Sequence, residues 1–535
     1  MIRHSISIVL IFLQITASAS HIFVAGDVSG TWDADTVFVT KDILVPDQQS
    51  LTIEPGVLVI FQGYYLFEVA GSIHAQGTHQ EQIRFTAEDT TGFHDLWEAQ
   101  GGWRGLRFHH VSGTNDSSVF AHCRFEFGKA AYDEDSTLWY GGAACIREFN
   151  RLRFSSCTFQ YNRAFKNGGA VYAKDADIIF NACHFADNFC GLDTLYGYGG
   201  GLCLEYSDAP VTNCLFEYNV STGVGGGLSF EHSDPRIGNN IFRNNFSALG
   251  GGMVCLRSDG LTTIAGNLFH NNSAYFFGGG IALIQATMLF TNNTLAFNTS
   301  GAGGGLYFNE SCFSVFKNTI LWGNADQGGG GPQVYIWDTF SAPEFYYCDV
   351  EGGEESFGGT GGLPGGFIGI YENNLESDPE FTASGDHPFG LQEISPCIDA
   401  GSPDTTGLQL PALDLAGNPR FSGPGLDIGA YEAEQSTFVT ATDMDDMEIR
   451  ILNNPFRDFT EIHVICPEEK DLLFSVYDQA GNPVYGPVSA RQDENRFLFR
   501  WDGKDHGRNP LKPGLYFVEI RSGKMQRTVK LIRLP

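Results

Sequence analysis

The sequence predicts an all-β protein, a right-handed parallel β-helix followed by a small antiparallel β-sandwich, and three observations lead to this prediction. The motif Phe-x-x-Asn, followed by a glycine pair and a short apolar run, recurs at regular intervals. The apolar runs are β-branched or aromatic and show no helical period. The 66 glycines among the 535 residues have no three-residue period, which excludes a collagen-like chain.

The repeat indicates a solenoid. Its phenylalanines are spaced 26, 31, 26 and 27 residues apart, and Leu295 follows after a further 26. About 25 residues per turn suits three short strands and three corners stacked in parallel, with equivalent positions ~4.8 Å apart. The usual handedness of parallel crossovers makes the helix right-handed. The members are FQYN (Phe159–Asn162), FADN (Phe185–Asn188), FEYN (Phe216–Asn219), FRNN (Phe242–Asn245), FHNN (Phe269–Asn272) and LAFN (Leu295–Asn298), after a degenerate FEFG (Phe125–Gly128).

Each residue type that recurs in the repeat has an expected position in the coil. We expect each Phe to stack on the next one inside the coil. The Asn residues are expected at a corner, hydrogen-bonded to their equivalents above and below and tolerant of left-handed dihedral angles. The glycines are expected at corners with positive φ, where a Cβ atom would clash. No helix follows these glycines and no Walker sequence is present, so we do not interpret them as a phosphate-binding loop.

The 12 cysteines are expected to be mostly structural. Cys157, Cys183 and Cys214 occupy the repeat position that Asn240, Asn267 and Asn293 fill later. A position that accepts Cys or Asn is typical of a stacked interior position, although an exported chain also permits disulfides. No CxxC motif is present, so the sequence does not indicate a zinc site.

Charge and hydropathy divide the chain into segments. The net charge of −31 argues against a nucleic-acid partner, whereas residues 449–535 carry 14 Lys/Arg against 11 Asp/Glu. A basic start, an apolar stretch and Ala17-Ser18-Ala19 predict a signal peptide over residues 1–19, and no other stretch is apolar enough to span a membrane. The expected order is then the β-helix (20–345, with a cap and early coils at 20–122 and repeats at 123–330), closing coils (346–434), an acidic linker (435–447) and a C-terminal domain (448–535).

The repeats resemble those of the polymorphic outer-membrane proteins of chlamydiae, in which Phe-x-x-Asn is paired with Gly-Gly-Ala or Gly-Gly-Leu. The resemblance covers residues 123–330 and implies a β-helical surface region that acts in adhesion. LTIEPG and WRGLRF near the N-terminus are similar to the opening of many exported bacterial β-helix proteins. SPCIDAGSPD (Ser395–Asp404), DLAGNPR (Asp414–Arg420) and LDIGAYE (Leu426–Glu432) are similar to their closing segment.

The C-terminal domain resembles the type IX secretion sorting domain of Bacteroidetes. The resemblance is carried by Asn454-Pro455-Phe456, the VYDQAG and WDG turns, and LKPGLYFVEI followed by GK and KLI. It implies that the type IX secretion machinery is a partner and that the protein is secreted or held at the outer-membrane cell surface. A FlgD-like immunoglobulin-type module is the alternative for the same residues.

Catalysis is weighed because parallel β-helices of the pectin-lyase type include polysaccharide lyases and hydrolases. Hydrolysis needs paired carboxylates at a fixed separation, and lyase chemistry needs a basic group with Ca²⁺ or another charge neutraliser. The coils show no such carboxylate series, and Lys129, Lys166 and Lys174 are their nearest group of lysines. We therefore predict no catalytic, metal or cofactor residues. Asp133-Glu134-Asp135 could bind Ca²⁺, but an acidic solvated loop is the favoured interpretation.

Two over-long corners give the candidate site. The second glycine follows the corner residue after 7 or 8 positions in most coils, but after 14 from Gly128 and 13 from Asn188. Insertions in solenoids gather on one face, which is often the binding face. The loops 129–140 and 189–198 should form walls about 10 Å apart, two strand spacings. The predicted groove residues are Trp139, Tyr140, Arg163, Lys166, Asp193, Tyr196 and Tyr198, and the alternative is that these aromatic rings only cover apolar surface.

The favoured function is therefore an adhesin or carbohydrate-binding surface protein, whose ligand is a polysaccharide or a cell-surface glycan. The alternatives are a polysaccharide lyase or glycoside hydrolase that uses the same groove, and a purely structural surface protein.

Overall fold

The structure is a computed structural model that describes residues 20–433 and 448–534. Residues 110, 193–195, 259, 261, 329, 364 and 422 in the first range, and 453, 455, 466–471, 480, 491–495, 523 and 524 in the second, are not described. The predicted signal peptide (1–19) and linker (435–447) lie outside the described residues. The chain divides into two compact units, one ending at Ala433 and the other beginning at Glu434.

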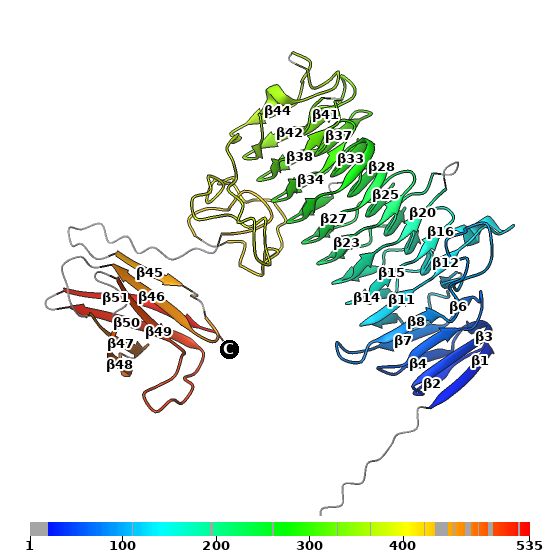
Figure 1. Ribbon diagram of the computed structural model, residues 1–535, viewed down its shortest axis with the longest axis horizontal. Helices are drawn as coiled ribbons and strands as arrows, with labels where there is room; N and C mark the ends of the chain where they lie inside the picture. Colours follow the sequence, from blue (N-terminus) through cyan, green and yellow to red (C-terminus); the bar gives the residue numbers. More distant parts are fainter. Residues whose placement is uncertain are drawn as a thin grey trace, which may run out of the picture. The chain divides into compact units, whose positions relative to one another are not determined.

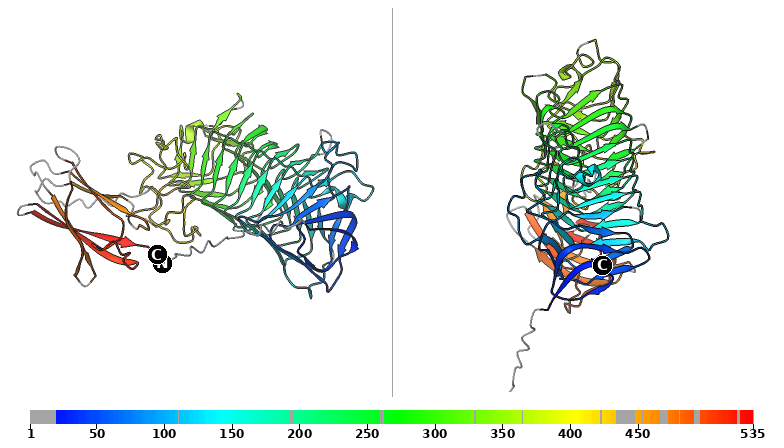
Figure 2. Two further views of the ribbon diagram at one scale, coloured as in Figure 1. Left: turned by 60° about the horizontal axis from the view of Figure 1, so that its bottom comes forward. Right: turned by 90° about the vertical axis from the view of Figure 1, so that its right-hand side faces the viewer.

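The first unit is a parallel β-helix in which the strands of successive coils stack in register (Figures 1 and 2). Each repeat coil contributes four short strands, which we number ladders I to IV in chain order. This is one more than the three that the repeat length suggests, because the segment after the corner Asn forms a two-residue ladder of its own. In the earliest coils this short ladder is absent, and β3 (Thr36–Val45) continues from ladder II into ladder IV.

Ladder I contains β2 (Gly30–Trp32), β4 (Ser50–Ile53), β7 (Ser72–Gln76), β10 (Ser118–Ala121), β14 (Leu152–Ser155), β18 (Ile179–Asn181), β22 (Val211–Thr212), β26 (Ile237–Gly238), β30 (Thr263–Ala265), β34 (Leu289–Thr291), β38 (Val315–Lys317), β42 (Glu344–Tyr346) and β44 (Ile370–Glu372). Ladder II contains the first half of β3, which also pairs with β1 (His21–Asp27), then β5 (Leu58–Phe61), β8 (Ile83–Ala87), β11 (Cys123–Glu126), β15 (Thr158–Gln160), β19 (His184–Ala186), β23 (Leu215–Glu217), β27 (Ile241–Arg243), β31 (Leu268–His270), β35 (Thr294–Ala296), β39 (Ile320–Trp322) and β43 (Asp349–Val350).

Ladder III contains β12 (Lys129–Ala130), β16 (Arg163–Ala164), β20 (Phe189–Cys190), β24 (Val220–Ser221), β28 (Phe246–Leu249), β32 (Ser273–Phe277), β36 (Thr299–Ser300) and β40 (Ala325–Asp326). Ladder IV contains the second half of β3, then β6 (Phe67–Val69), β9 (Leu106–Phe108), β13 (Ala144–Arg147), β17 (Val171–Lys174), β21 (Leu202–Glu205), β25 (Leu228–Glu231), β29 (Met253–Ser258), β33 (Ile281–Ala286), β37 (Leu306–Asn309) and β41 (Val334–Ile336). The only helical turns among the described residues are the 3₁₀ turns η1 (Ser136–Trp139) and η2 (Glu354–Ser356).

The core is a column of stacked phenylalanines, as the repeat predicts. The rings of Phe185 and Phe216 lie 4.6 Å apart and those of Phe242 and Phe269 lie 4.5 Å apart, each pair within 2° of parallel. Strand spacing in a parallel sheet brings identical side chains to this distance, so stacking follows from the register. These side chains are fully buried, and they supply much of the apolar area that stabilises each coil.

The corner asparagines form the predicted hydrogen-bonded ladder. From Asn162 to Asn298, each side-chain Nδ2 atom donates to the Oδ1 atom of the next Asn at 2.9 to 3.0 Å. Each Nδ2 also donates to a buried backbone carbonyl group of the preceding coil, as Asn245 does to Phe216. The repeat position shared by Cys214 and Asn240 is also linked from coil to coil, because the backbone amide of Cys214 donates to the side chain of Asn240 at 2.8 Å. The eleven cysteines among the described residues are buried free thiols.

The backbone bend differs from our expectation for the corner Asn. The residue before each Asn adopts the left-handed conformation, for example Tyr161 and Tyr218 at φ 55°. The Asn side chain must point inward to join the ladder, so the bend is made one position earlier, where the side chain is solvent-exposed. The glycines behave as predicted: Gly250 has φ 64°, and a Cβ atom on Gly251 would lie 2.4 Å from the carbonyl oxygen of Ser273.

The chain stops coiling after β44 (Ile370–Glu372), within residues 346–434, which we expected to form closing coils or the C-terminal segment of the β-helix. Residues 376–433, which we call the return segment, instead run back along the outside of the solenoid, beside β27 to β34 in Figure 1. The side chain of Asn239 donates to Leu413 at 2.9 Å, and that of Asn292 donates to Asp427 at 2.7 Å. Phe389 and Tyr431 pack against outward-facing residues of ladder II. The segment therefore covers apolar side chains that the last coils would otherwise expose.

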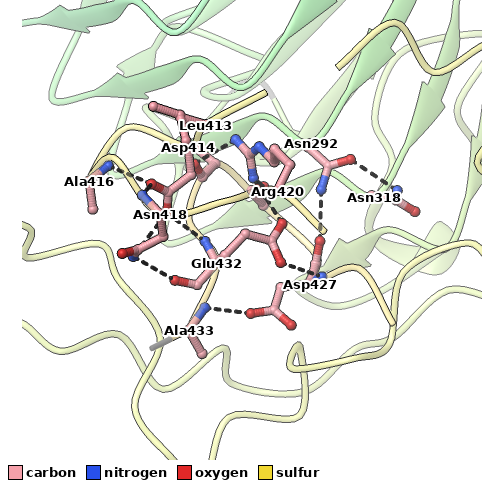
Figure 3. Close-up of polar contacts among 12 residues, drawn as sticks. Asn292, Asn318, Leu413, Asp414, Ala416, Asn418, Arg420, Asp427, Glu432 and Ala433 are labelled. Carbon is pink, nitrogen blue, oxygen red and sulfur yellow. Dashed lines mark hydrogen bonds and ion pairs between the residues drawn. The ribbon is translucent and has the colours of Figure 1, made fainter. Parts of the chain in front are cut away.

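A buried polar cluster holds the return segment together (Figure 3). The Arg420 side chain is 0% exposed, and its Nη1 atom lies 3.2 Å from the Glu432 carboxylate. Its Nη2 atom donates to the carbonyl oxygen of Ala430 at 2.7 Å, and Asp414 accepts from the backbone amide of Glu432 at 2.8 Å. These residues belong to the motifs DLAGNPR and LDIGAYE, whose polar residues therefore serve to fold the segment.

The second unit contains two antiparallel sheets packed face to face. One has the order β45 (Glu448–Leu452), β46 (Thr460–Ile465) and β49 (Arg496–Trp501), and the other has the order β48 (Pro483–Ala490), β47 (Leu472–Asp478), β50 (Gly514–Ser522) and β51 (Met525–Arg533). Buried residues from both sheets form one core, in which the rings of Phe474 and Phe499 stack at 4.9 Å. This is the small antiparallel sandwich that the sequence predicts.

Candidate functional site

Three insertions project from the same corner of the solenoid, between ladders II and IV. Two of them are the predicted loops, which follow β11 and β19. The third lies between Ala87 at the end of β8 and Leu106 at the start of β9, one coil earlier. We did not predict it, because residues 88–105 precede the regular repeats. Its length is visible in the sequence once the coil before the first Phe-x-x-Asn motif is measured in the same way.

The loops of residues 88–105 and 129–140 bring three aromatic rings together over Phe165, which follows β16, and we call Trp97, Tyr132, Trp139 and Phe165 the aromatic platform. The Trp97 ring lies 5.3 Å from Tyr132 and 4.9 Å from Phe165. The Trp139 ring lies 5.6 Å from Tyr132 and 5.0 Å from Phe165. Phe165 is fully buried, whereas Trp97 is 55% and Tyr132 is 43% exposed. The platform is thus a surface of exposed rings supported by a buried one.

Lys129 joins the loop of residues 129–140 to the loop of residues 88–105. Its side chain is fully buried, and its Nζ atom donates to the carbonyl oxygens of Gln100 at 2.7 Å and Gly92 at 3.0 Å. Burial lowers the pKa of Lys129 to about 8. The backbone amide of Tyr132 also donates to the carbonyl oxygen of Leu96 at 2.7 Å. The ring positions are therefore fixed by contacts between the loops.

Two carboxylates of the loop of residues 129–140, Asp133 and Asp135, make contacts within the loops. The indole nitrogen of Trp139 donates to the carbonyl oxygen of Asp133 at 2.7 Å, and the Asp133 carboxylate pairs with Arg104 at 3.1 Å. Asp135 accepts hydrogen bonds from the hydroxyl group and the backbone amide of Thr137; both lower its pKa, and the second caps η1. The described residues contain no cluster of three or more His, Cys, Asp or Glu side chains that could hold a metal ion.

Two of the predicted groove residues cover the sheet. The Tyr140 ring lies 4.6 Å from that of Tyr172, and both Tyr140 and Tyr198 pack against the cluster of Cys145, Tyr172 and Cys203 on the outer face of ladder IV. Burial accordingly raises the pKa of Tyr198. For these two residues the structure matches the covering alternative.

Of the other predicted residues, Lys166 and Arg163 contact aromatic rings of the corner loops. The Lys166 ammonium is 5.7 Å from the centre of the Tyr140 ring. The backbone amide of Lys166 donates to the carbonyl oxygen of Trp139 at 2.9 Å. The Arg163 guanidinium lies 4.6 Å from the ring of Phe189, in the loop of residues 189–198. Burial lowers the pKa of Arg163. Tyr196 is 66% exposed. Asp193 lies outside the described residues. The structure thus brings Trp139, Tyr140 and Lys166 together.

The platform combines exposed apolar faces with polar groups at their edges. Exposed aromatic rings pack against the C–H faces of ligands through their apolar area, while indole and phenol groups offer hydrogen bonds. Such an arrangement can bind a ring-shaped, hydroxyl-rich ligand without a covalent step.

The fold defines the class of protein, a right-handed parallel β-helix with a C-terminal β-sandwich. The family model described as a right-handed β-helix region matches residues 109–295 and 194–350. No curated protein sequence matches the chain. No helix among the described residues is long and apolar enough to cross a membrane.

Proposed function

We propose that the protein is an exported β-helix protein of the cell surface that binds carbohydrate through the aromatic platform, as an adhesin or glycan-binding protein. The exposure of Trp97 and Tyr132 above the buried Phe165 is the observation that carries the proposal. Water contacts large apolar faces there at a free-energy cost, and a ligand that covers them recovers roughly 25 cal/mol per Å².

Rigidity of the loops supports the proposal. Because Lys129 and the Tyr132–Leu96 hydrogen bond hold the two loops together, little conformational entropy is lost when a ligand docks on the rings. A site whose rings are already in place binds more tightly than a mobile loop with the same residues.

Export and surface localisation form the second part of the proposal. The apolar N-terminal stretch and the A-x-A site at residues 17–19 favour a secretory signal peptide. The C-terminal unit, with its Asp-Gly and Gly-Asn turns, serves as a type IX secretion sorting domain. Deleting residues 448–535 in the native host should leave the β-helix in the periplasm, whereas surface display of the truncated protein would contradict this assignment.

The binding proposal is tested with Trp97→Ala and Tyr132→Ala, each compared with the wild-type chain on a glycan array and by titration calorimetry. Phe313→Ala is the matched control, because Phe313 is 50% exposed and lies outside the three corner loops. We expect the platform variants to weaken binding about tenfold or more, equivalent to roughly 1.4 kcal/mol, while the control binds normally. If both platform variants bind every glycan that the wild-type chain binds with unchanged affinity, the proposal is contradicted.

A further inference from the structure

The residue before the first glycine of each coil forms a ladder along one outer edge of the solenoid. The backbone amide of Gly168 donates to Tyr198 at 2.8 Å, and that of Gly199 donates to Val224 at 3.0 Å. The same contact joins Gly225 to Leu249 and, at 3.1 Å, Gly250 to Phe277. We call this series the edge ladder, which consists of Tyr140, Asn167, Tyr198, Val224, Leu249, Phe277 and Ala302. It lies between ladders III and IV, and the strands of ladder III can be followed from β12 to β28 in Figure 1.

A second aromatic group lies at the far end of the edge ladder. Phe277 is in contact with Tyr307 at 4.7 Å, Trp337 at 5.4 Å and Tyr335 at 5.7 Å between ring centroids. The neighbouring Tyr275 is 68% exposed and Trp337 is 49% exposed. The distal cluster, as we name it, consists of Tyr275, Phe276, Phe277, Tyr307, Tyr335 and Trp337.

The platform and the distal cluster are at opposite ends of the same ladder. Trp139 of the platform directly precedes Tyr140, the first member, and Phe277 is five positions further along the ladder. At ~4.8 Å per position, the two aromatic surfaces are about 24 Å apart along the solenoid axis. Between them the edge ladder consists of the buried Asn167 and the half-buried Tyr198, Val224 and Leu249, so the track is apolar from Tyr198 to Phe277.

Two ion pairs lie beside the middle of this track. On the outer face of ladder IV, Lys174 pairs with Glu205, which also accepts from the Tyr172 hydroxyl at 2.5 Å. Two coils further on, Arg257 pairs with Glu231. At the platform end, the cations Arg147 and Lys166 lie over the Tyr140 ring, 5.0 and 5.7 Å from its centroid. The chain carries a net charge of −31, which repels an acidic polysaccharide, whereas an uncharged polymer leaves the ion pairs intact.

We propose that a linear, uncharged polysaccharide binds along the edge ladder and contacts the aromatic platform with one end and the distal cluster with the other. The inference rests on the proposed carbohydrate binding and adds the ligand's length, direction and charge. Once a chain is held at the platform, its contact with the distal cluster is intramolecular, so affinity rises with chain length until both clusters are reached.

The test is a length series of cello-, manno- and xylo-oligosaccharides, from disaccharide to decasaccharide, titrated into the full chain by calorimetry. We expect affinity to rise by about 100-fold between oligomers that reach one cluster and those that reach both, the lower range of linked binding. Trp337→Ala should remove this gain and leave short-oligomer binding intact, while Trp97→Ala weakens both. Phe313→Ala again serves as the control, and polygalacturonate oligomers provide the acidic comparison.

The outcomes separate the two proposals. If affinity does not depend on oligosaccharide length and the Trp337→Ala variant binds as the wild type does, the edge-ladder site is overturned and the platform remains as the glycan site. A preference for polygalacturonate, or a glycan array positive only for acidic or branched glycans, also overturns this inference alone. An array without any hit overturns both proposals.

Discussion

The Nζ atom of Lys129 lies 2.7 Å from the carbonyl oxygen of Gln100, so that a lysine of one corner loop is buried against the backbone of another. Lys129→Met keeps the length of the side chain but removes both hydrogen bonds to the loop of residues 88–104, leaving two carbonyl groups without that donor. We expect faster amide hydrogen exchange across this loop and weaker glycan binding, although all four platform rings remain. Lys41→Met, at an exposed position of β3, is the control. Unchanged exchange in the loop would show that Lys129 does not fix it.

The asparagine ladder should be a principal source of stability. Asn245 donates through Nδ2 to Phe216 and Asn272 and accepts two hydrogen bonds from Asn219, all at a fully buried position. Asn245→Ala leaves several of these groups unsatisfied and should lower the free energy of unfolding by about 3 kcal/mol or more, at 1–3 kcal/mol per group. Urea denaturation measures the loss. Asn309→Ala, at a half-buried position of β37, should change the midpoint far less, and equal effects would contradict a special role for the ladder.

The buried ion pair of Arg420 and Glu432 in the return segment can be tested with a single variant and a double variant that should restore stability. Arg420→Met leaves the Glu432 carboxylate buried without its partner, which costs roughly 3–5 kcal/mol. The double variant Arg420→Met/Glu432→Met removes both charges and should recover most of that loss. Limited proteolysis within residues 376–433 reports detachment of the segment. If the double variant is as susceptible as the single one, the defect is one of packing and not of charge.

Asp349 should make stability depend on pH. It is fully buried, accepts from the Cys397 thiol at 3.1 Å, and burial raises its pKa from 3.8 to about 6. The folded state therefore holds a proton that the unfolded state releases between about pH 4 and pH 6, so this contribution to stability falls as pH rises through that window. A shift of this size corresponds to about 3 kcal/mol at most.

The measurement is thermal unfolding of the wild type and Asp349→Asn across that pH range. The difference between their curves should vary between about pH 4 and pH 6 and become constant above it. Asp386→Asn, at an exposed position of the return segment, is the control. A pH-independent difference for Asp349→Asn would mean that its pKa is the same in the folded and unfolded states.

Periodic features could be predicted from the sequence because the physics of a stack repeats with the sequence. Phe242, Asn245 and Gly251 could each be assigned a place from spacing alone, since equivalent residues of successive coils must meet. The position of the left-handed bend was predicted less well. Spacing identifies which residue lies at the corner, but not whether that residue or the preceding one makes the turn so that the side chain can point inward.

Features that occur once could not be predicted in this way. The contact of Asn292 with Asp427 joins residues far apart in the chain, and neither belongs to a pattern that the other shares. The same holds for Trp97, which reaches the predicted loop only because Lys129 holds residues 88–104 against it. Of the predicted site residues, Trp139 is half-buried among the rings of the aromatic platform, whereas Tyr140 and Tyr198 pack against the sheet because Cys145, Tyr172 and Cys203 offer them apolar area.

The coil repeat has a consequence for how this molecule can change over evolution. Because Asn219 and Asn245 are 26 residues apart and occupy equivalent positions, excising Val220–Asn245 would join two coils that already match in hydrogen bonding and core packing. Such an event would leave both aromatic surfaces intact and bring them closer by one strand spacing. Recombination within the gene can thus alter the spacing between the two aromatic surfaces by whole coils, independently of the residues that form each surface.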